Sequence, residues 1–198
     1  VVHQAKAVGT ISPAAGTVNA DSFDNTVISG HTALAEEPAD TDEFLISDAG
    51  TIKRIDYSYI KASNTPSFHV YASSSQTVTG GGQTKVVFNT EVVDTDNAFA
   101  SNTFTVPSGK GGKYLMYACV HNSNKQPARY HVQIRQGNSE KLTLENGNGG
   151  AYAGVHVSGL VDASAGDTFD VYYYNSEGSD MTIDGGISKM YFGGFKLA

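Results

Sequence analysis

Short hydrophobic runs recur along most of this chain, and turn residues separate one run from the next. From Ser67 onward the runs are rich in Val, Thr, Tyr and Phe, which favour pleated strands. The breaks between them, such as TGGGQ, PSGKGG and NGNGG, are too short for a crossover helix, so we expect antiparallel sheets in a sandwich. The runs that predict strands are FHVYA, KVVFNTEVV, NTFTVP, KYLMYACVH, ARYHVQIRQ, EKLTLE, YAGVHVSGLV, DTFDVYYYN and ISKMYFGGFKL.

Two of these runs are apolar on both faces. Between Tyr114 and Val120, successive residues are hydrophobic whichever side of the strand they occupy. The run from Phe169 to Tyr174 comes close to the same pattern, with Phe169, Val171 and Tyr173 opposite Tyr172 and Tyr174. A two-layer sandwich covers one face of each sheet, so the second face needs another subunit, the chain's own N-terminal segment, or tyrosine hydroxyls in contact with water. We take a subunit interface as the first hypothesis. Its candidate residues are Tyr114, Met116, Ala118, Tyr172 and Tyr174.

The first third of the chain differs from the rest. Residues 1–62 carry nine acidic and four basic side chains, contain few aromatics, and repeat a short phrase of the form Gly-Thr-Ile or Gly-Thr-Val. Within them, residues 44–47 and 51–57 can pair as two strands across Asp48-Ala49-Gly50, which predicts a β-hairpin with glycine in its turn. Small polar residues and Pro66 then form a plausible linker. We therefore expect a connector at 1–62 and a separate β-domain at 63–198.

The order of strands and turns in the second part resembles a known family. Its pieces are FTVP ahead of a Gly-rich turn and Tyr114, the turn Ala165-Gly166-Asp167 before a strand, and the final YFGGF. Together, from about Phe68 to Leu197, they resemble the globular heads of the complement component 1q family, which shares a jelly roll with the tumour necrosis factor ligands. The resemblance implies an all-β antiparallel jelly roll that forms a homotrimer around aromatic strands and binds targets through apical loops.

A second and looser resemblance covers the segment from about Asp24 to Lys61. Its sequence is similar to connector segments of tailed-bacteriophage fibre and other virion proteins, and it contains no Gly-X-Y collagen repeat. The two resemblances together imply a trimeric virion protein. Residues 1–62 would dock onto other virion proteins, and the C-terminal knob would contact a glycan or receptor on the host surface. The alternatives are a capsid decoration protein and a free bacterial lectin-like adhesin.

Composition and charge narrow the possible partners. The 198 residues include 22 Gly, 11 Tyr and 9 Phe, which suits a turn-rich β chain better than a helical bundle. The net charge of −7 argues against a nucleic-acid partner, because phosphate binding needs clustered Lys and Arg. No stretch approaches the roughly 20 apolar residues of a membrane span. We therefore expect neither nucleic-acid binding nor membrane insertion.

The only cysteine and the first residues add two expectations. Cys119 lies in the apolar run YLMYACV, which predicts a buried and inert thiol and excludes an intrachain disulfide. The chain begins at Val1 without the charge or apolar core of a signal peptide. This start is consistent with a processed product or with the C-terminal part of a longer protein.

No recognisable catalytic motif is present. The sequence has no GxSxG elbow, no phosphate-binding loop and no HExxH, and its histidines lack the spacing of zinc ligands. We expect His69, His131 and His156, which alternate with apolar residues, to be solvated or at an interface. We therefore predict no enzymatic activity and no cofactor.

Two acidic loops are the remaining candidates for chemistry. One contains Glu91, Asp94 and Asp96, and the other contains Glu177, Asp180 and Asp184. Glycoside hydrolysis needs two carboxyl groups roughly 5–10 Å apart, which sequence spacing alone does not establish. Residues 94–97 also place oxygen donors at alternate positions, as calcium loops do, but lack the distal Glu of an EF-hand. A weak calcium site there is left open.

The surface most suited to a host glycan is a set of loops rich in Asn, Gln and Ser, which we expect to cluster at one end of the jelly roll. Amide and hydroxyl groups offer both donors and acceptors to sugar hydroxyls, although the same residues are ordinary turn formers. Three weak sites on a trimeric knob would add by avidity. The candidate contacts are Asn122, Asn124, Gln126, Arg135, Asn138 and Asn175.

Overall fold

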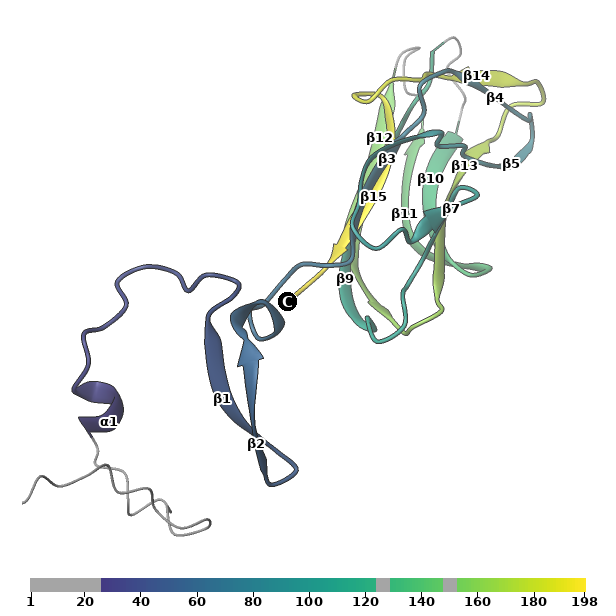
Figure 1. The fold of residues 1–198 in the computed structure, drawn as a ribbon. Helices are drawn as coiled ribbons and strands as arrows, with labels where there is room; N and C mark the ends of the chain where they lie inside the picture. The colour runs from purple at the N-terminus through teal and green to yellow at the C-terminus, as the bar shows by residue number, and fades with distance from the viewer. Residues whose placement is uncertain (1–25, 124–128, 148–152) are drawn as a thin grey trace, which may run out of the picture. The chain divides into compact units, whose positions relative to one another are not determined.

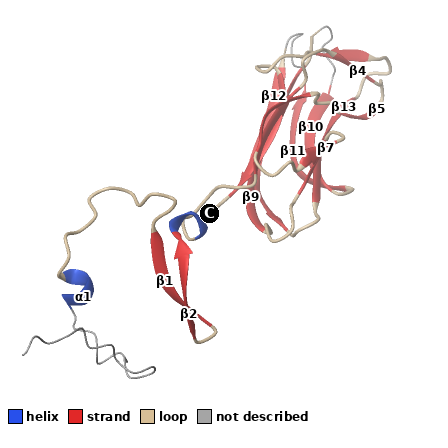
Figure 2. Cartoon of the chain, in the orientation of Figure 1, coloured by secondary structure: helices blue, strands red, loops and turns tan. Residues whose placement is uncertain are grey.

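The computed structural model describes residues 26–123, 129–147 and 153–198. The chain forms two compact units, an N-terminal unit that extends to Lys61 and a knob, Ala62–Ala198. In the N-terminal unit a short helix α1 (Thr26–Ser29) precedes a two-stranded hairpin and a 3-10 turn at Tyr57–Tyr59. The knob consists of β-strands (Figures 1 and 2).

Two antiparallel sheets face each other in the knob (Figure 1). The first sheet has the order β12-β9-β15-β3-β6, and the second has the order β11-β10-β13-β8-β7 with β5 also paired to β13. Strands β14 and β4 form a separate two-stranded ribbon, whose Val78, Met181 and Ile183 belong to the core. The strands of the first sheet are β12 (Gly154–Ala163), β9 (Gly112–His121), β15 (Met190–Lys196), β3 (Ser67–Tyr71) and β6 (Thr90–Asp94). Those of the second sheet are β11 (Ser139–Gly147), β10 (Arg129–Gln136), β13 (Thr168–Asn175), β8 (Thr103–Thr105), β7 (Phe99–Ala100) and β5 (Gly82–Lys85). Those of the ribbon are β14 (Met181–Ile183) and β4 (Gln76–Val78).

The core lies between the two sheets and follows from strand alternation. In β9 every second residue from Tyr114 to Val120 is fully buried, and in β13 Phe169, Val171 and Tyr173 are buried in the same way. Phe68 of β3 stacks on Phe104 of β8 with ring centroids 4.3 Å apart, which joins one sheet to the other. The expected all-β antiparallel jelly roll is confirmed.

One predicted strand is interrupted. The run KVVFNTEVV contains the end of β5 and most of β6, and residues 86–89 between them belong to neither sheet. There the backbone N–H of Val87 donates to the side chain of Gln76, and that of Phe88 donates to Asn102, each at 2.9 Å. The run breaks because the chain crosses here from the second sheet to the first.

The hairpin of the N-terminal unit pairs β1 (Glu43–Asp48) with β2 (Thr51–Asp56). Its turn consists of Ala49 and Gly50, both with positive φ, as a tight two-residue hairpin turn requires. Leu45 and Ile52 remain 79% and 69% exposed. Within the described residues these two apolar side chains are not covered, and a two-stranded hairpin of this kind is only marginally stable by itself.

Candidate functional site

The outer face of the first sheet carries a cluster of aromatic and apolar side chains, which we call the outer aromatic patch. Strand alternation places these residues there, because their neighbours along each strand point into the core. The register brings His156 opposite Cys119, Cys119 opposite Tyr191, and Tyr117 and His69 each opposite Gly193. The patch consists of His69, Leu115, Tyr117, Cys119, His156 and Tyr191.

The rings of the patch form a continuous layer. The Tyr117 hydroxyl lies 3.0 Å from Nδ1 of His69. The ring centroid of Tyr191 lies 5.6 Å from that of His69, 6.3 Å from that of Tyr117 and 6.2 Å from that of His156. Gly193 allows this arrangement, because a Cβ at that position would clash with the Tyr117 hydroxyl. The patch is therefore a packed surface rather than a scatter of exposed rings.

Partial burial keeps several groups of the patch uncharged near neutral pH. It lowers the pKa of His69, which disfavours the imidazolium. Burial also raises the pKa of the Tyr117 and Tyr191 hydroxyls and of the Cys119 thiol. Such a neutral, aromatic and half-exposed surface is suited to contact with another protein surface.

Three of the five predicted interface residues lie on the opposite face. Tyr114, Met116 and Ala118 are fully buried between the sheets of one chain, so the expectation that they face a partner was wrong. The reason is that β9 is apolar on both faces, and its inner face turned out to be the one that begins with Tyr114. The half-buried residues of the outer face are instead Leu115, Tyr117 and Cys119, together with His69 and Tyr191 from neighbouring strands.

The other two candidates, Tyr172 and Tyr174, lie half-buried on the outer face of the second sheet. The Arg135 guanidinium sits over the Tyr172 ring, 4.0 Å from its centroid. Arg135 donates to the side chains of Gln133 and Gln83 through Nε and Nη2. Its Nη1 makes no hydrogen bond within the part of the chain that the structure describes, so this group is available to an acceptor on a ligand.

Tyr174 stacks on His131 with ring centroids 4.6 Å apart. His131 is only 7% exposed, and neither ring nitrogen has a hydrogen-bond partner within the described residues. Burial lowers the pKa of His131, so this histidine behaves as a neutral structural ring.

The predicted glycan contacts do not gather at one end of the knob. Asn175 pairs with Tyr130 at the start of β10, whereas Arg135 and the turn that contains Asn138 lie at its other end. Asn122 and Asn175 are fully buried. Asn122 accepts from the backbone of Ala153, and Asn175 holds the backbone of residues 177 and 179, so both serve the fold. Asn124 and Gln126 lie outside the described residues.

Three of the acidic candidates, Asp94, Asp180 and Asp184, also contact the fold. Asp94 accepts hydrogen bonds from the backbone N–H groups of Ala98 and Phe99, at 3.0 and 2.8 Å. Asp180 accepts from Gly80, and Asp184 pairs with Lys189 at 3.0 Å. Among the described residues no group of three His, Cys, Asp or Glu is arranged to hold a metal ion. The described part of the chain also contains no helix long and apolar enough to cross a membrane.

Solved structures share the fold of the knob at low sequence identity. PRD1 vertex protein P5 aligns over 69% of this chain and 100% of its own, with a TM-score of 0.55 and 14% identity. Eiger TNF from S. frugiperda covers 67% of this chain and 92% of its own, with a TM-score of 0.53 and 14% identity. Murine APRIL covers 66% of this chain and 98% of its own, with a TM-score of 0.52 and 14% identity. These likenesses show a tumour necrosis factor-like jelly roll.

The globular domain of zebrafish complement 1qA aligns at 18% identity with a TM-score of 0.44, over 68% of this chain and 98% of its own. No protein-family model matches the sequence, and no curated protein matches it.

Proposed function

We propose that this chain is a trimeric virion protein of a bacteriophage, a fibre or tip whose knob contacts a glycan on the host surface. The observation that carries the proposal is the outer aromatic patch, a packed layer of neutral rings that stays half-exposed on a single chain. A second and a third copy would cover it. The sequence resemblance to trimeric heads, and the likeness in fold to a vertex protein and to tumour necrosis factor ligands, support this choice.

Sedimentation of the purified full chain tests the trimer. We expect a trimer at micromolar concentration, and we expect Tyr117→Asp to dissociate it because a carboxylate would be buried among apolar rings. Tyr172→Asp on the second sheet is the matched control and should remain trimeric. A monomeric wild-type chain, or dissociation by Tyr172→Asp alone, contradicts self-association through the patch.

We assign docking onto other virion proteins to the N-terminal unit. Its hairpin exposes Leu45 and Ile52, and four of its charged side chains are paired within it, Lys53 with Asp48 and Arg54 with Glu43. A docking arm favours a virion component over a free lectin-like adhesin. Copy number per particle separates a fibre, with few trimers, from a capsid decoration protein, with many.

Arg135 is the proposed glycan contact. Its Nη1, which makes no hydrogen bond within the described residues, and the adjacent Tyr172 ring lie on the second sheet, away from the patch. We expect Arg135→Ala to reduce binding of the knob to host cells while its melting temperature stays close to that of the wild type. Lys113→Ala, which removes a different exposed cation, should leave binding unchanged. Unchanged adsorption of Arg135→Ala would refute the assignment.

A further inference from the structure

The outer aromatic patch has one chemical property that a purely hydrophobic interface would not need. His69 lies on β3, at one side of the patch, hydrogen-bonded to a neutral hydroxyl and next to the rings of Tyr117 and Tyr191. Histidine is the side chain whose ordinary pKa lies nearest to neutral pH, so it can change charge where the tyrosine hydroxyls and the thiol of the patch do not.

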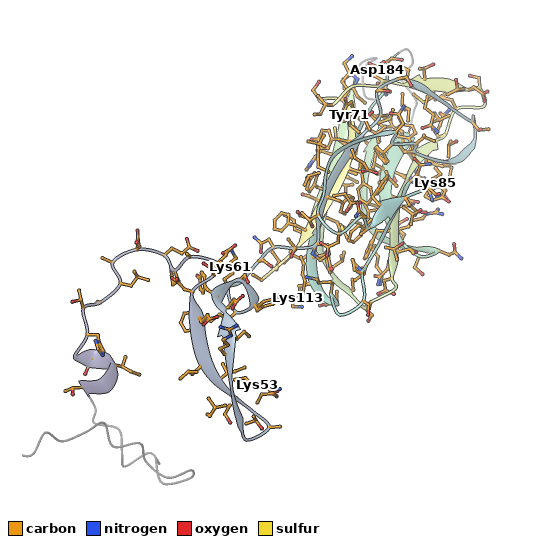
Figure 3. The ribbon with its side chains drawn as sticks, viewed as in Figure 1. Lys53, Lys61, Tyr71, Lys85, Lys113 and Asp184 are labelled. Atoms are coloured by element: carbon orange, nitrogen blue, oxygen red, sulfur yellow. The ribbon has the colours of Figure 1, made fainter. Side chains whose placement is uncertain are left out.

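The charged groups of the surrounding strands are directed elsewhere. On β9, Lys113 and His121 each lie four residues from Tyr117, roughly 13 Å along the strand. Lys113 pairs with Asp162 of β12 at 2.8 Å, and His121 lies 3.5 Å from Asp184, which also binds Lys189. Figure 3 shows Lys113 and Asp184 at opposite ends of the knob.

The remaining neighbours offer no carboxylate to His69 either. Val93 of β6 lies opposite His69, and the register shifts at this point, between His69 and Val70. Burial is the cause of the lowered pKa of His69, with no contribution from Glu91 or Asp94. From β3, β9 and β15 the titratable neighbours are Tyr71, Tyr117, Cys119 and Tyr191, and from β12 His156. Within the described residues, a positive charge on His69 would therefore have no opposite charge beside it.

We propose that His69 makes self-association through the outer aromatic patch sensitive to pH, so that the copies pack while His69 is neutral and separate when it is protonated. The inference rests on the proposed trimer and adds its regulation. Around a threefold axis, protonation would introduce three equivalent positive charges into a surface that has lost its water. The desolvation of these charges and their mutual repulsion would both weaken association.

Proton linkage determines whether association strengthens or weakens as pH falls. Partial burial already lowers the pKa of His69 in a single chain, and cover by further copies would lower it more. The assembled state then binds fewer protons than the separate chains, so association weakens as pH falls below the pKa of the separate chain. If assembly lowers the pKa by about one unit at each of three histidines, the association constant falls roughly a thousand-fold at a pH below both values.

The test compares association constants of the full chain, by sedimentation, at about pH 7.5 and about pH 5.5, on either side of the ordinary histidine pKa. The readout is the ratio of the two constants for each variant, with far-UV circular dichroism to verify that the knob stays folded. We expect a large ratio for the wild type and a clearly smaller ratio for His69→Gln. The control His31→Gln, in the N-terminal unit, should keep the wild-type ratio.

A second measurement covers the case in which His69→Gln does not assemble. The pKa of His69 in the wild-type chain, measured by NMR titration, should fall as protein concentration rises and chains associate. A wild-type trimer with equal constants at both pH values, a His69 pKa independent of concentration, or an unchanged ratio in His69→Gln overturns the inference and leaves the trimer standing. A wild-type chain that is monomeric at about pH 7.5 overturns the proposed trimer itself.

Discussion

At the scale of single residues, two adjacent glycines determine how the first sheet packs on both sides. A Cβ at Gly193 would clash with the Tyr117 hydroxyl on the outer face, and one at Gly194 would clash with the Met116 sulfur on the inner face. Each glycine thus makes room for a side chain of β9. The repeat in YFGGF therefore has a packing reason as well as a place in a family pattern.

Gly193→Ala should displace the Tyr117 ring and break its hydrogen bond to His69. We expect a loss of about 1–3 kcal/mol in the free energy of unfolding, as for other overpacked sites, together with weaker self-association. Chemical denaturation and sedimentation measure the two effects. Gly178→Ala is the control, because a Cβ there meets nothing within 4 Å, and equal behaviour of the two variants would contradict this role of Gly193.

Tyr114 should make the knob sensitive to alkali. Its hydroxyl donates to the carbonyl of Lys110 at 2.6 Å, and burial, with a smaller effect of the Asp96 charge, raises its pKa to about 12. The pKa of tyrosine in the unfolded chain is about 10. The protonated Tyr114 hydroxyl therefore contributes its full stabilisation of the fold below that pH, and this stabilisation is lost as pH rises through the raised pKa of the folded chain.

Tyr114→Phe should therefore reduce the alkaline decline of the unfolding free energy measured in urea, and cost about 1 kcal/mol at neutral pH through the lost hydrogen bond. The decline should be reduced rather than abolished, because burial raises the pKa of Tyr173 as well. Tyr59→Phe is the control at an exposed ring. An alkaline profile of Tyr114→Phe identical to the wild type would exclude the assignment.

Residue roles were the least predictable part of the candidate site. A strand that is apolar on both faces, such as β9, contains no sequence signal that says which face is inward. Asn122 and Asn175 were expected at the surface because asparagine is common in loops, yet both bind backbone groups in the interior. The sequence does not distinguish an asparagine that binds backbone from one that meets solvent.

At the scale of elements, the runs of β-type residues located most of the long strands, because alternation and turn residues are local signals. The break in KVVFNTEVV was not predictable. It depends on Gln76 and Asn102, which reach the run from outside it, and Asn89 is the one turn residue inside it.

The hairpin β1–β2 should depend on its turn. Gly50 has φ +83, a region that costs other residues roughly 1–2 kcal/mol, so we expect Gly50→Val to increase amide hydrogen exchange across residues 43–56. Exchange in the knob serves as the internal control and should not change. Unchanged protection of the hairpin would show that contacts other than the turn hold it.

At the scale of the whole molecule, the knob contains its own core. Every residue of the hydrophobic core cluster lies between Phe68 and Phe192, so residues 62–198 expressed alone should fold and self-associate as the full chain does. Calorimetry and sedimentation of this fragment measure both properties. Failure of the fragment to fold would mean that the N-terminal unit contributes to the stability of the knob.

The hydrophobic pattern did not predict the order of the strands in this knob. Alternation predicts that a segment is a strand but not which strand lies beside it, so the jelly roll followed from the resemblance of motifs in order. The two long sheets and the antiparallel pairing agree with it.

The placement of β15 between β3 and β9 has a consequence for biosynthesis. On the ribosome, β3 and β9 emerge long before Met190 is made, and until then each presents an unsatisfied edge to neighbouring nascent chains. The knob therefore closes in one late step, and a product truncated before Met190 would be a substrate for chaperones or proteases rather than a shorter working protein.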